Sequence, residues 1–129
     1  MIWKQLFFHL HTFLLLIPGF GQPIHPQVIG ELHKDLGECS GLAALPSGHF
    51  AQINDSGNPP CIFFTDTSGK LIDLECLPFA KNRDWEDLAY GDGYLFVGDF
   101  GNNRNTRMDL KIYRLGINER AFAVGGRRN

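Results

Sequence analysis

The chain has 129 residues, a formal net charge of −2 and 43% hydrophobic residues. This mild charge gives no basis for an electrostatic nucleic-acid or anionic-membrane site, and the basic residues form no stripe interleaved with aromatic side chains. The only cluster of basic residues, Arg120, Arg127 and Arg128, lies at the carboxyl end. We therefore expect no nucleic-acid partner.

The first 21 residues have the composition of an export signal. Lys4 gives a positively charged start, Leu6–Ile17 is largely apolar, and the small residues Gly19 and Gly21 occupy the positions that a signal peptidase reads. A membrane anchor is the alternative, but the apolar run has about 12 residues, and spanning a bilayer takes roughly 20. We expect a signal helix over residues 1–21 and no stable membrane span after its cleavage.

Residues 22–37 contain Pro23 and Pro26 and are expected to form a linker. Four short strand patterns follow within residues 38–80, separated by runs of Gly, Pro, Asn, Asp and Ser that suit tight turns. The expected strands are Cys39–Leu45, His49–Asn54, Cys61–Thr65 and Lys70–Leu77. Together they predict one four-stranded antiparallel sheet.

A second, incomplete unit is expected over residues 81–115. Its strands are Trp85–Tyr90, Tyr94–Phe100 and Met108–Leu115, and Gly91-Asp92-Gly93 supplies the first hairpin turn. A fourth strand is either missing or poorly represented by Ile117–Val124. We expect residues 116–129 to be an irregular tail.

Two phrases recur between these units. Asp55–Asn58 and Asp99–Asn102 share the pattern D-x-G-N at an offset of 44, and Ser40–Ala43 corresponds to Glu86–Ala89 at an offset of 46. A period of about 40 to 50 residues with four short strands per repeat is typical of a β-propeller. The sequence therefore predicts an all-β fold, a partial β-propeller with about two four-stranded antiparallel blades.

Two blades are fewer than a closed propeller contains, because closure takes roughly four to eight blades. We therefore expect this sequence to be an N-terminal piece of a longer protein, whose remaining blades would be its structural partners. The alternative is a complete two-blade unit that forms a ring by oligomerisation.

Three cysteines leave at least one without an intrachain partner. A disulfide between Cys39 and Cys61 is conceivable, because the repeat places them in nearby strands of an exported protein. Buried free thiols at Cys39, Cys61 and Cys76 are the alternative that we favour. Their spacing does not fit a zinc site.

Four phrases together resemble those of secreted bacterial six-bladed β-propellers, in the neighbourhood of NHL-type, gluconolactonase-like and phytase-like proteins. They are Cys39–Ala43, Asn54–Asn58, Asn82–Ala89 and Gly98–Asn103. The likeness covers Glu38–Leu115. It implies a secreted or periplasmic protein with a central channel lined by carboxylates and amides, which in some members holds calcium. Several such families are enzymes, and the resemblance selects no single activity.

Acidic and amide side chains at corresponding strand ends are the candidate site residues. Glu38, Asp84 and Glu86 are candidate calcium ligands, because repeat symmetry would bring the starts of the first strands around one axis. Residues after the second strands are candidates for orienting a ligand: Asn54, Asp55, Asp99, Asn102 and Asn103. A purely structural role in turns is the alternative, and we favour it for Asp55 and Asp99.

Two functions remain open from the sequence. The first is an exported propeller that binds a small molecule, glycan or protein, or serves as a scaffold. The second is a calcium-dependent hydrolase of lactonase or phosphoesterase type, in which the metal would polarise the substrate or activate water. No histidine lies near the acidic phrases, so a Ser-His-Asp arrangement is not expected.

Overall fold

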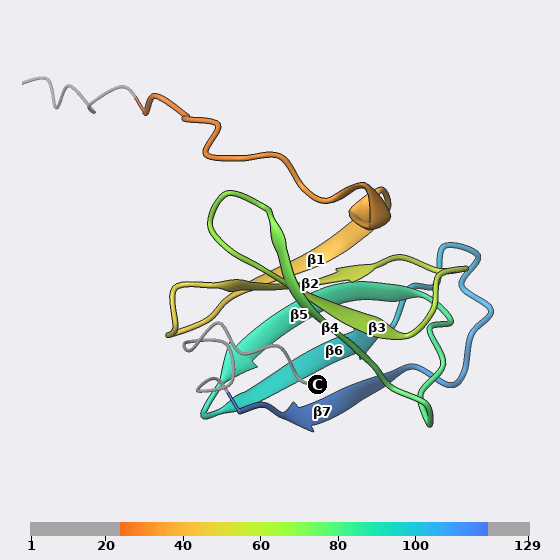
Figure 1. Ribbon diagram of the computed structural model, residues 1–129. Helices are drawn as coiled ribbons and strands as arrows, with labels where there is room; N and C mark the ends of the chain where they lie inside the picture. Colours follow the sequence, from red (N-terminus) through yellow and green to blue (C-terminus); the bar gives the residue numbers. More distant parts are fainter. Residues whose placement is uncertain (1–23, 119–129) are drawn as a thin grey trace, which may run out of the picture.

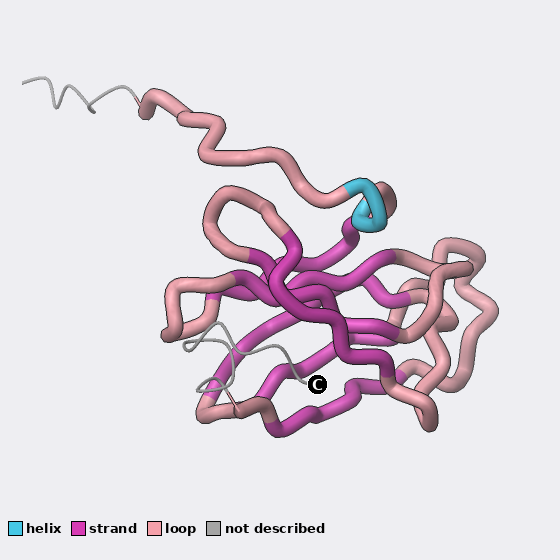
Figure 2. Tube along the Cα trace, viewed as in Figure 1, coloured by secondary structure: helices cyan, strands magenta, loops and turns pink. Residues whose placement is uncertain are grey.

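The computed structural model describes residues 24–118, which form two antiparallel β-sheets arranged as two layers (Figure 1). The first sheet contains four strands in chain order: β1 (Cys39–Ala44), β2 (Phe50–Asn54), β3 (Cys61–Thr65) and β4 (Leu71–Cys76). The second sheet contains three: β5 (Trp85–Gly91), β6 (Tyr94–Asp99) and β7 (Lys111–Gly116). The rest of the described chain is loop and turn apart from one short 3-10 helix, η1 (Lys34–Leu36) (Figure 2).

These elements confirm the predicted all-β class and its two antiparallel sheets. The expected signal helix over residues 1–21 and most of the weak fourth-strand candidate, Ile117–Val124, lie outside the described residues. Within residues 24–118 no helix combines the length and apolar character needed to cross a membrane.

The tight turn between β5 and β6 follows directly from its sequence. Asp92 and Gly93 have φ angles of 51° and 81°, both in the left-handed region. A two-residue hairpin with two positive φ angles matches the right-handed twist of its strands, and Asp-Gly is a preferred pair for it. The turn therefore places β5 and β6 side by side.

The core lies between the facing sides of the two sheets, which we call the inner faces. Ala43, Ile53, Leu88 and Val97 are among its members and are at most 6% exposed. Gly41 permits the close approach of β1 to β5, because a Cβ atom at this position would lie 2.8 Å from the backbone nitrogen of Leu88. Burial of these apolar side chains is the main force that holds the sheets together.

Each sheet has an irregularity at the start of its first strand. Cys39 pairs with Asn54 and Gly41 with Ile53, so Ser40 is the extra residue of a β-bulge. In the second sheet the same shift occurs between the Trp85–Asp99 and Asp87–Gly98 pairs, so Glu86 is the extra residue. Asn54 and Asp99 therefore hold the same position in their sheets. The repeated D-x-G-N phrase, which aligns Asp55 with Asp99, is out of structural register by one residue.

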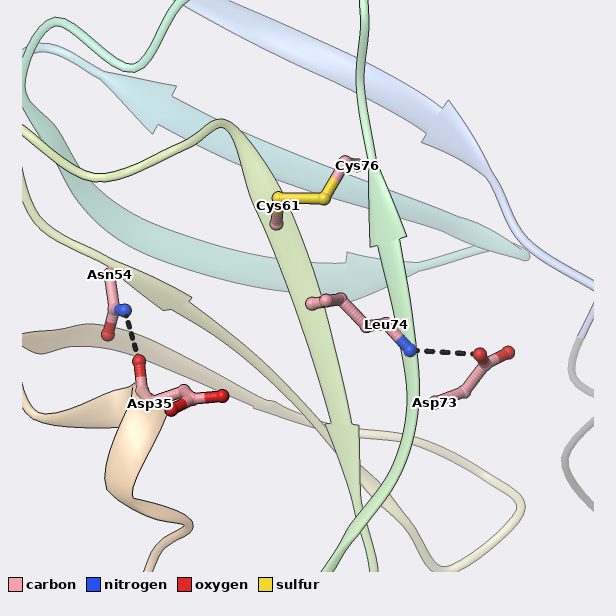
Figure 3. Close-up of a disulfide and its surroundings, with 6 residues drawn as sticks. All are labelled: Asp35, Asn54, Cys61, Asp73, Leu74 and Cys76. Atoms are coloured by element: carbon pink, nitrogen blue, oxygen red, sulfur yellow. Dashed lines mark hydrogen bonds between the residues drawn. A yellow bond between two sulfur atoms is a disulfide. The ribbon is translucent and has the colours of Figure 1, made fainter.

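The structure contains one disulfide, between Cys61 and Cys76 (Figure 3). These two cysteines lie directly opposite each other on β3 and β4. The favoured set of three free thiols and the Cys39–Cys61 bond considered beside it are both wrong. The physical reason is the register, because Asn54 of β2 is the partner of Cys39. Cys39 stays a free, half-buried thiol, and burial raises its pKa.

The segment before β1 packs against the first sheet. Leu36 is 3% exposed and contacts Cys61 and Phe63. The carbonyl oxygen of Asp35 accepts a hydrogen bond of 2.7 Å from the side-chain amide of Asn54 (Figure 3). This segment, expected to be a linker, thereby covers part of the side of the first sheet that faces away from the second.

Candidate functional site

Three carboxylates meet at one end of the two-sheet stack. Oxygen atoms of Asp55, Asp84 and Glu86 all lie within 4.8 Å of one another, and we call this group the acidic cluster. Asp55 follows β2 in the first sheet, whereas Asp84 directly precedes β5 and Glu86 is its bulge residue. Both sheets therefore contribute to the acidic cluster.

Asn82 connects the two parts of this site. Its side-chain nitrogen donates hydrogen bonds to the carbonyl oxygens of Asn54 (2.9 Å) and Asp55 (2.8 Å). Its side-chain oxygen accepts a hydrogen bond from the backbone nitrogen of Trp85, at 3.2 Å. One amide side chain thus fixes the loop after β2 against the start of β5, and so sets the spacing of the carboxylates.

Gly101 forms the wall against which two of the carboxylates lie. Its backbone nitrogen donates to the carbonyl oxygen of Asp84 at 3.0 Å. A Cβ atom on Gly101 would lie 2.2 Å from the carboxyl carbon of Asp84 and 2.6 Å from a carboxylate oxygen of Glu86. The acidic side chains therefore occupy space that any residue other than glycine would fill.

The electrostatics of the acidic cluster disfavour three negative charges. Partial burial raises the pKa of the Glu86 carboxyl, and the nearby carboxylates of Asp55 and Asp84 raise it further. Across residues 24–118, no ion pair involves a member of the acidic cluster. A cation placed among these oxygens would relieve the repulsion, because an opposite charge favours the ionised form of each acid.

Asp99, one of the candidate ligand-orienting residues, takes part in an ion pair inside the protein. It is fully buried, and its carboxylate accepts hydrogen bonds from the Arg107 guanidinium at 3.0 Å and from the backbone nitrogen of Asp84 at 3.1 Å. Arg107 also donates to the carbonyl oxygens of Asp99 and Gly101. The Asp99–Arg107 pair therefore fixes the loop after β6 and keeps Gly101 beside the acidic cluster.

The remaining predicted residues are not members of the acidic cluster. Glu38, the third predicted metal ligand, is not a member of the acidic cluster and accepts a hydrogen bond of 2.6 Å from the Asn58 amide. Asn54 is 4% exposed. The side-chain oxygen of Asn102 accepts from the backbone nitrogens of Thr106 and Arg107, and Asn103 is exposed. The structure thus brings Asp84 and Glu86 together with Asp55 instead of Glu38.

Sequence reasoning missed Asn82 and Gly101 as residues that build the site. Asn82 lies within the acidic phrase around Trp85, and Gly101 lies within the second D-x-G-N phrase, so both positions lay within phrases that the sequence had already marked. Arg107 was considered as a partner of the acids around Trp85, and the structure pairs it with Asp99 and Asp109 instead.

Comparison with known proteins adds no assignment. No family model matches this chain, and no curated protein matches it. The function is therefore argued from the geometry of the acidic cluster and of the sheets that carry it.

Proposed function

We propose that this chain is a calcium-binding module of β-propeller type, which serves as a binding or scaffold unit of an exported protein. The observation that carries the proposal is the acidic cluster, in which two sheets present three carboxylates within 4.8 Å of one another. The export signal expected in residues 1–21 supports the location outside the cytoplasm.

The relation between the two sheets supports a propeller. Both have the same antiparallel strand order, and both have a bulge at the second residue of the first strand. The inner face of the first sheet packs on the second sheet, with β1 close to β5. Repeated sheets that stack in this way, with their first strands nearest one another, are the construction principle of propeller blades.

Calcium is the ion that best suits the donor atoms. Ca²⁺ binds six to eight oxygen ligands at flexible geometry, and carboxylates are its preferred charged ligands. Asp55, Asp84 and Glu86 would supply them, with backbone carbonyl groups and water completing the shell. The space against Gly101 supports this assignment, because it lets two acidic side chains approach the same point. A bound ion would link the sheets and leave its remaining coordination positions to a ligand.

The change Glu86→Gln tests the calcium site through two opposite effects. The raised pKa means that folded Glu86 binds a proton more readily than unfolded Glu86. Protonated Glu86 therefore stabilises the fold at low pH. This contribution to the free energy of unfolding is lost as the pH rises above the ordinary pKa of glutamate and through the raised pKa of Glu86. In a chelator at pH 7, Glu86→Gln is expected to raise the melting temperature by a few degrees. In millimolar calcium the wild type is expected to have the higher melting temperature, because binding of calcium stabilises the wild-type fold.

Glu38→Gln is the matched control, because it makes the same chemical change close to the site but outside the acidic cluster. Its melting temperature should rise with calcium as much as that of the wild type. Equal calcium shifts in the wild type and Glu86→Gln, or no shift in either, would refute the proposed site.

The hydrolase of lactonase or phosphoesterase type is the second candidate, and the acidic cluster favours it. A metal ion held by Asp55, Asp84 and Glu86 would keep coordination positions free to polarise a lactone or phosphate ester. With calcium present, the protein should turn over a simple lactone or an aryl phosphate. Glu86→Gln should then lose most of the calcium-dependent turnover while remaining folded, because it removes a carboxylate from the metal site. Absence of calcium-dependent turnover with both substrate types would exclude this candidate.

A further inference from the structure

The segment before β1 and the first sheet form a pocket between them, on the side of this sheet that faces away from the second, its outer face. The pocket has a volume of about 200 Å³, and Ile29, Leu32, Leu42, Phe50 and Gln52 are among its lining residues. Ile29 and Leu32 belong to the segment, whereas the other three belong to β1 and β2. Apolar cavities of about 150 Å³ in proteins hold a molecule of the size of benzene. The pocket therefore has room for a small ring compound.

Close backbone contacts hold the segment in place as one wall of the pocket. A Cβ atom on Gly30 would lie 2.0 Å from the carbonyl oxygen of Ser68, and one on Gly69 would lie 2.2 Å from the carbonyl oxygen of Glu31. The segment thus contacts the turn between β3 and β4 at distances that only glycine permits. Nearer to β1, the buried side chain of Leu36 anchors the segment on the same face of the sheet. The fold itself therefore builds this pocket.

One polar side chain, that of Gln52, lies at this pocket without a partner. The residues on either side of it along β2, Ala51 and Ile53, enter the core, so the alternation of the strand directs Gln52 to the outer face. Its neighbours across the sheet, Leu42 and Phe63, have no polar side-chain atoms. Within the described chain, neither polar atom of the fully buried Gln52 amide has a hydrogen-bond partner. A buried amide without partners is costly, so its donor and acceptor are available for recognition.

The lining residues define the chemistry of a ligand. A carboxamide presents a donor N–H beside an acceptor oxygen, so its complement is a planar group with an acceptor beside a donor. A cyclic amide has this arrangement on the edge of a ring. No charged side chain lines the pocket among residues 24–118, so a charged ligand would lose its hydration without compensation. Gln52 is shielded from water, so solvent would compete little with its hydrogen bonds to a ligand.

We propose that this pocket binds a small neutral ring compound that carries a cyclic amide. The ring packs against Ile29, Leu42 and Phe50, and its amide edge exchanges two hydrogen bonds with Gln52. Apolar walls with a small number of precisely placed polar groups are the usual form of a small-molecule site. The pocket contains no member of the acidic cluster. The proposal is therefore independent of the proposed calcium site.

Titration of the full, isotope-labelled chain with δ-valerolactam, a six-membered cyclic amide, tests the proposal by NMR. The side-chain NH₂ signal of Gln52 should shift saturably at millimolar ligand. N-methyl-δ-valerolactam keeps the ring and the acceptor but lacks the donor. It should bind at least about fivefold more weakly, because the amide oxygen of Gln52 then stays unpaired. Equal affinities of the two compounds, or no saturable shift, as expected if only water fills the pocket, would overturn the proposal.

Gln52→Met provides a second test, followed through the backbone signals of Leu42 and Phe50. Methionine fills the space of the amide but offers no donor, so this variant should bind both compounds equally weakly. Gln27→Met is the matched control, because Gln27 is exposed in the segment before β1 and lies outside the pocket. It should keep the preference for δ-valerolactam. Binding of δ-valerolactam to Gln52→Met as tight as to the wild type would contradict the proposal, and the two compounds discriminate on the wild type even if Gln52→Met does not fold.

Discussion

Replacing Trp85 with alanine is expected to lower the free energy of unfolding by about 3–5 kcal/mol, the usual cost of removing a large buried aromatic side chain. Trp85 is completely buried in the core between the sheets, and its ring lies 6.0 Å from that of Tyr113, centroid to centroid. The substitution would leave a cavity at the start of β5, beside the acidic cluster. Chemical denaturation followed by far-ultraviolet circular dichroism measures the effect.

Trp85→Phe is the matched control for this change. The indole nitrogen of Trp85 has no hydrogen-bond partner in the described part of the chain, so phenylalanine loses packing volume but no polar contact. Its destabilisation should be clearly smaller than that of Trp85→Ala. Equal losses for the two variants would show that the cavity is not the cause.

Removing the disulfide is expected to lower the free energy of unfolding by about 3 kcal/mol. This is the usual effect of a bond that closes a loop of about 15 residues in the unfolded chain. Cys61 and Cys76 are 15 residues apart in sequence and join β3 to the edge strand β4. The double variant Cys61→Ala/Cys76→Ala should therefore unfold at lower denaturant concentration than the wild type. The same shift should follow when the wild type is reduced.

Cys39→Ala provides the comparison, because Cys39 is free. Its stability should change much less than that of the double variant, and reduction should still destabilise it. A double variant as stable as the wild type would mean that the bond between β3 and β4 constrains the unfolded chain little.

Local sequence signals predicted the strands well, because the turns between them are chemically distinct. The Asp92-Gly93 turn required two positive φ angles, which this pair accepts readily, and the structure has them. The short apolar run Cys61–Thr65 forms β3, which is buried throughout its length. In both cases the sequence signal lies within a few consecutive residues.

The acidic cluster was predicted in part. Asp84 and Glu86 meet as expected, but Asp55 takes the place considered for Glu38. The D-x-G-N alignment treated Asp55 and Asp99 as equivalent, whereas the pairs Cys39–Asn54 and Trp85–Asp99 make Asn54, one residue earlier, the structural counterpart of Asp99. That single step makes Asp99 a buried partner of Arg107 and leaves Asp55 at the site.

Contacts between residues far apart in sequence were beyond local pattern analysis. The side chain of Asn82 donates hydrogen bonds to the backbone of Asn54 and Asp55, which lie 28 and 27 positions earlier in the chain. The Cys61–Cys76 bond depends on which residues of β3 and β4 lie opposite each other. Both follow from strand register and sheet packing, which three cysteines and a repeated phrase do not specify.

The bulges also have a consequence for how such a protein can change its chemistry. The extra residue of a bulge departs from the strict in–out alternation of the strand, so a bulge can redirect a side chain without changing the rest of the sheet. The first sheet carries Ser40 at this position and the second carries Glu86. The same bulge position thus holds a buried hydroxyl in the first sheet and a member of the acidic cluster in the second, so the two sheets can differ in chemistry here while their shared architecture is retained.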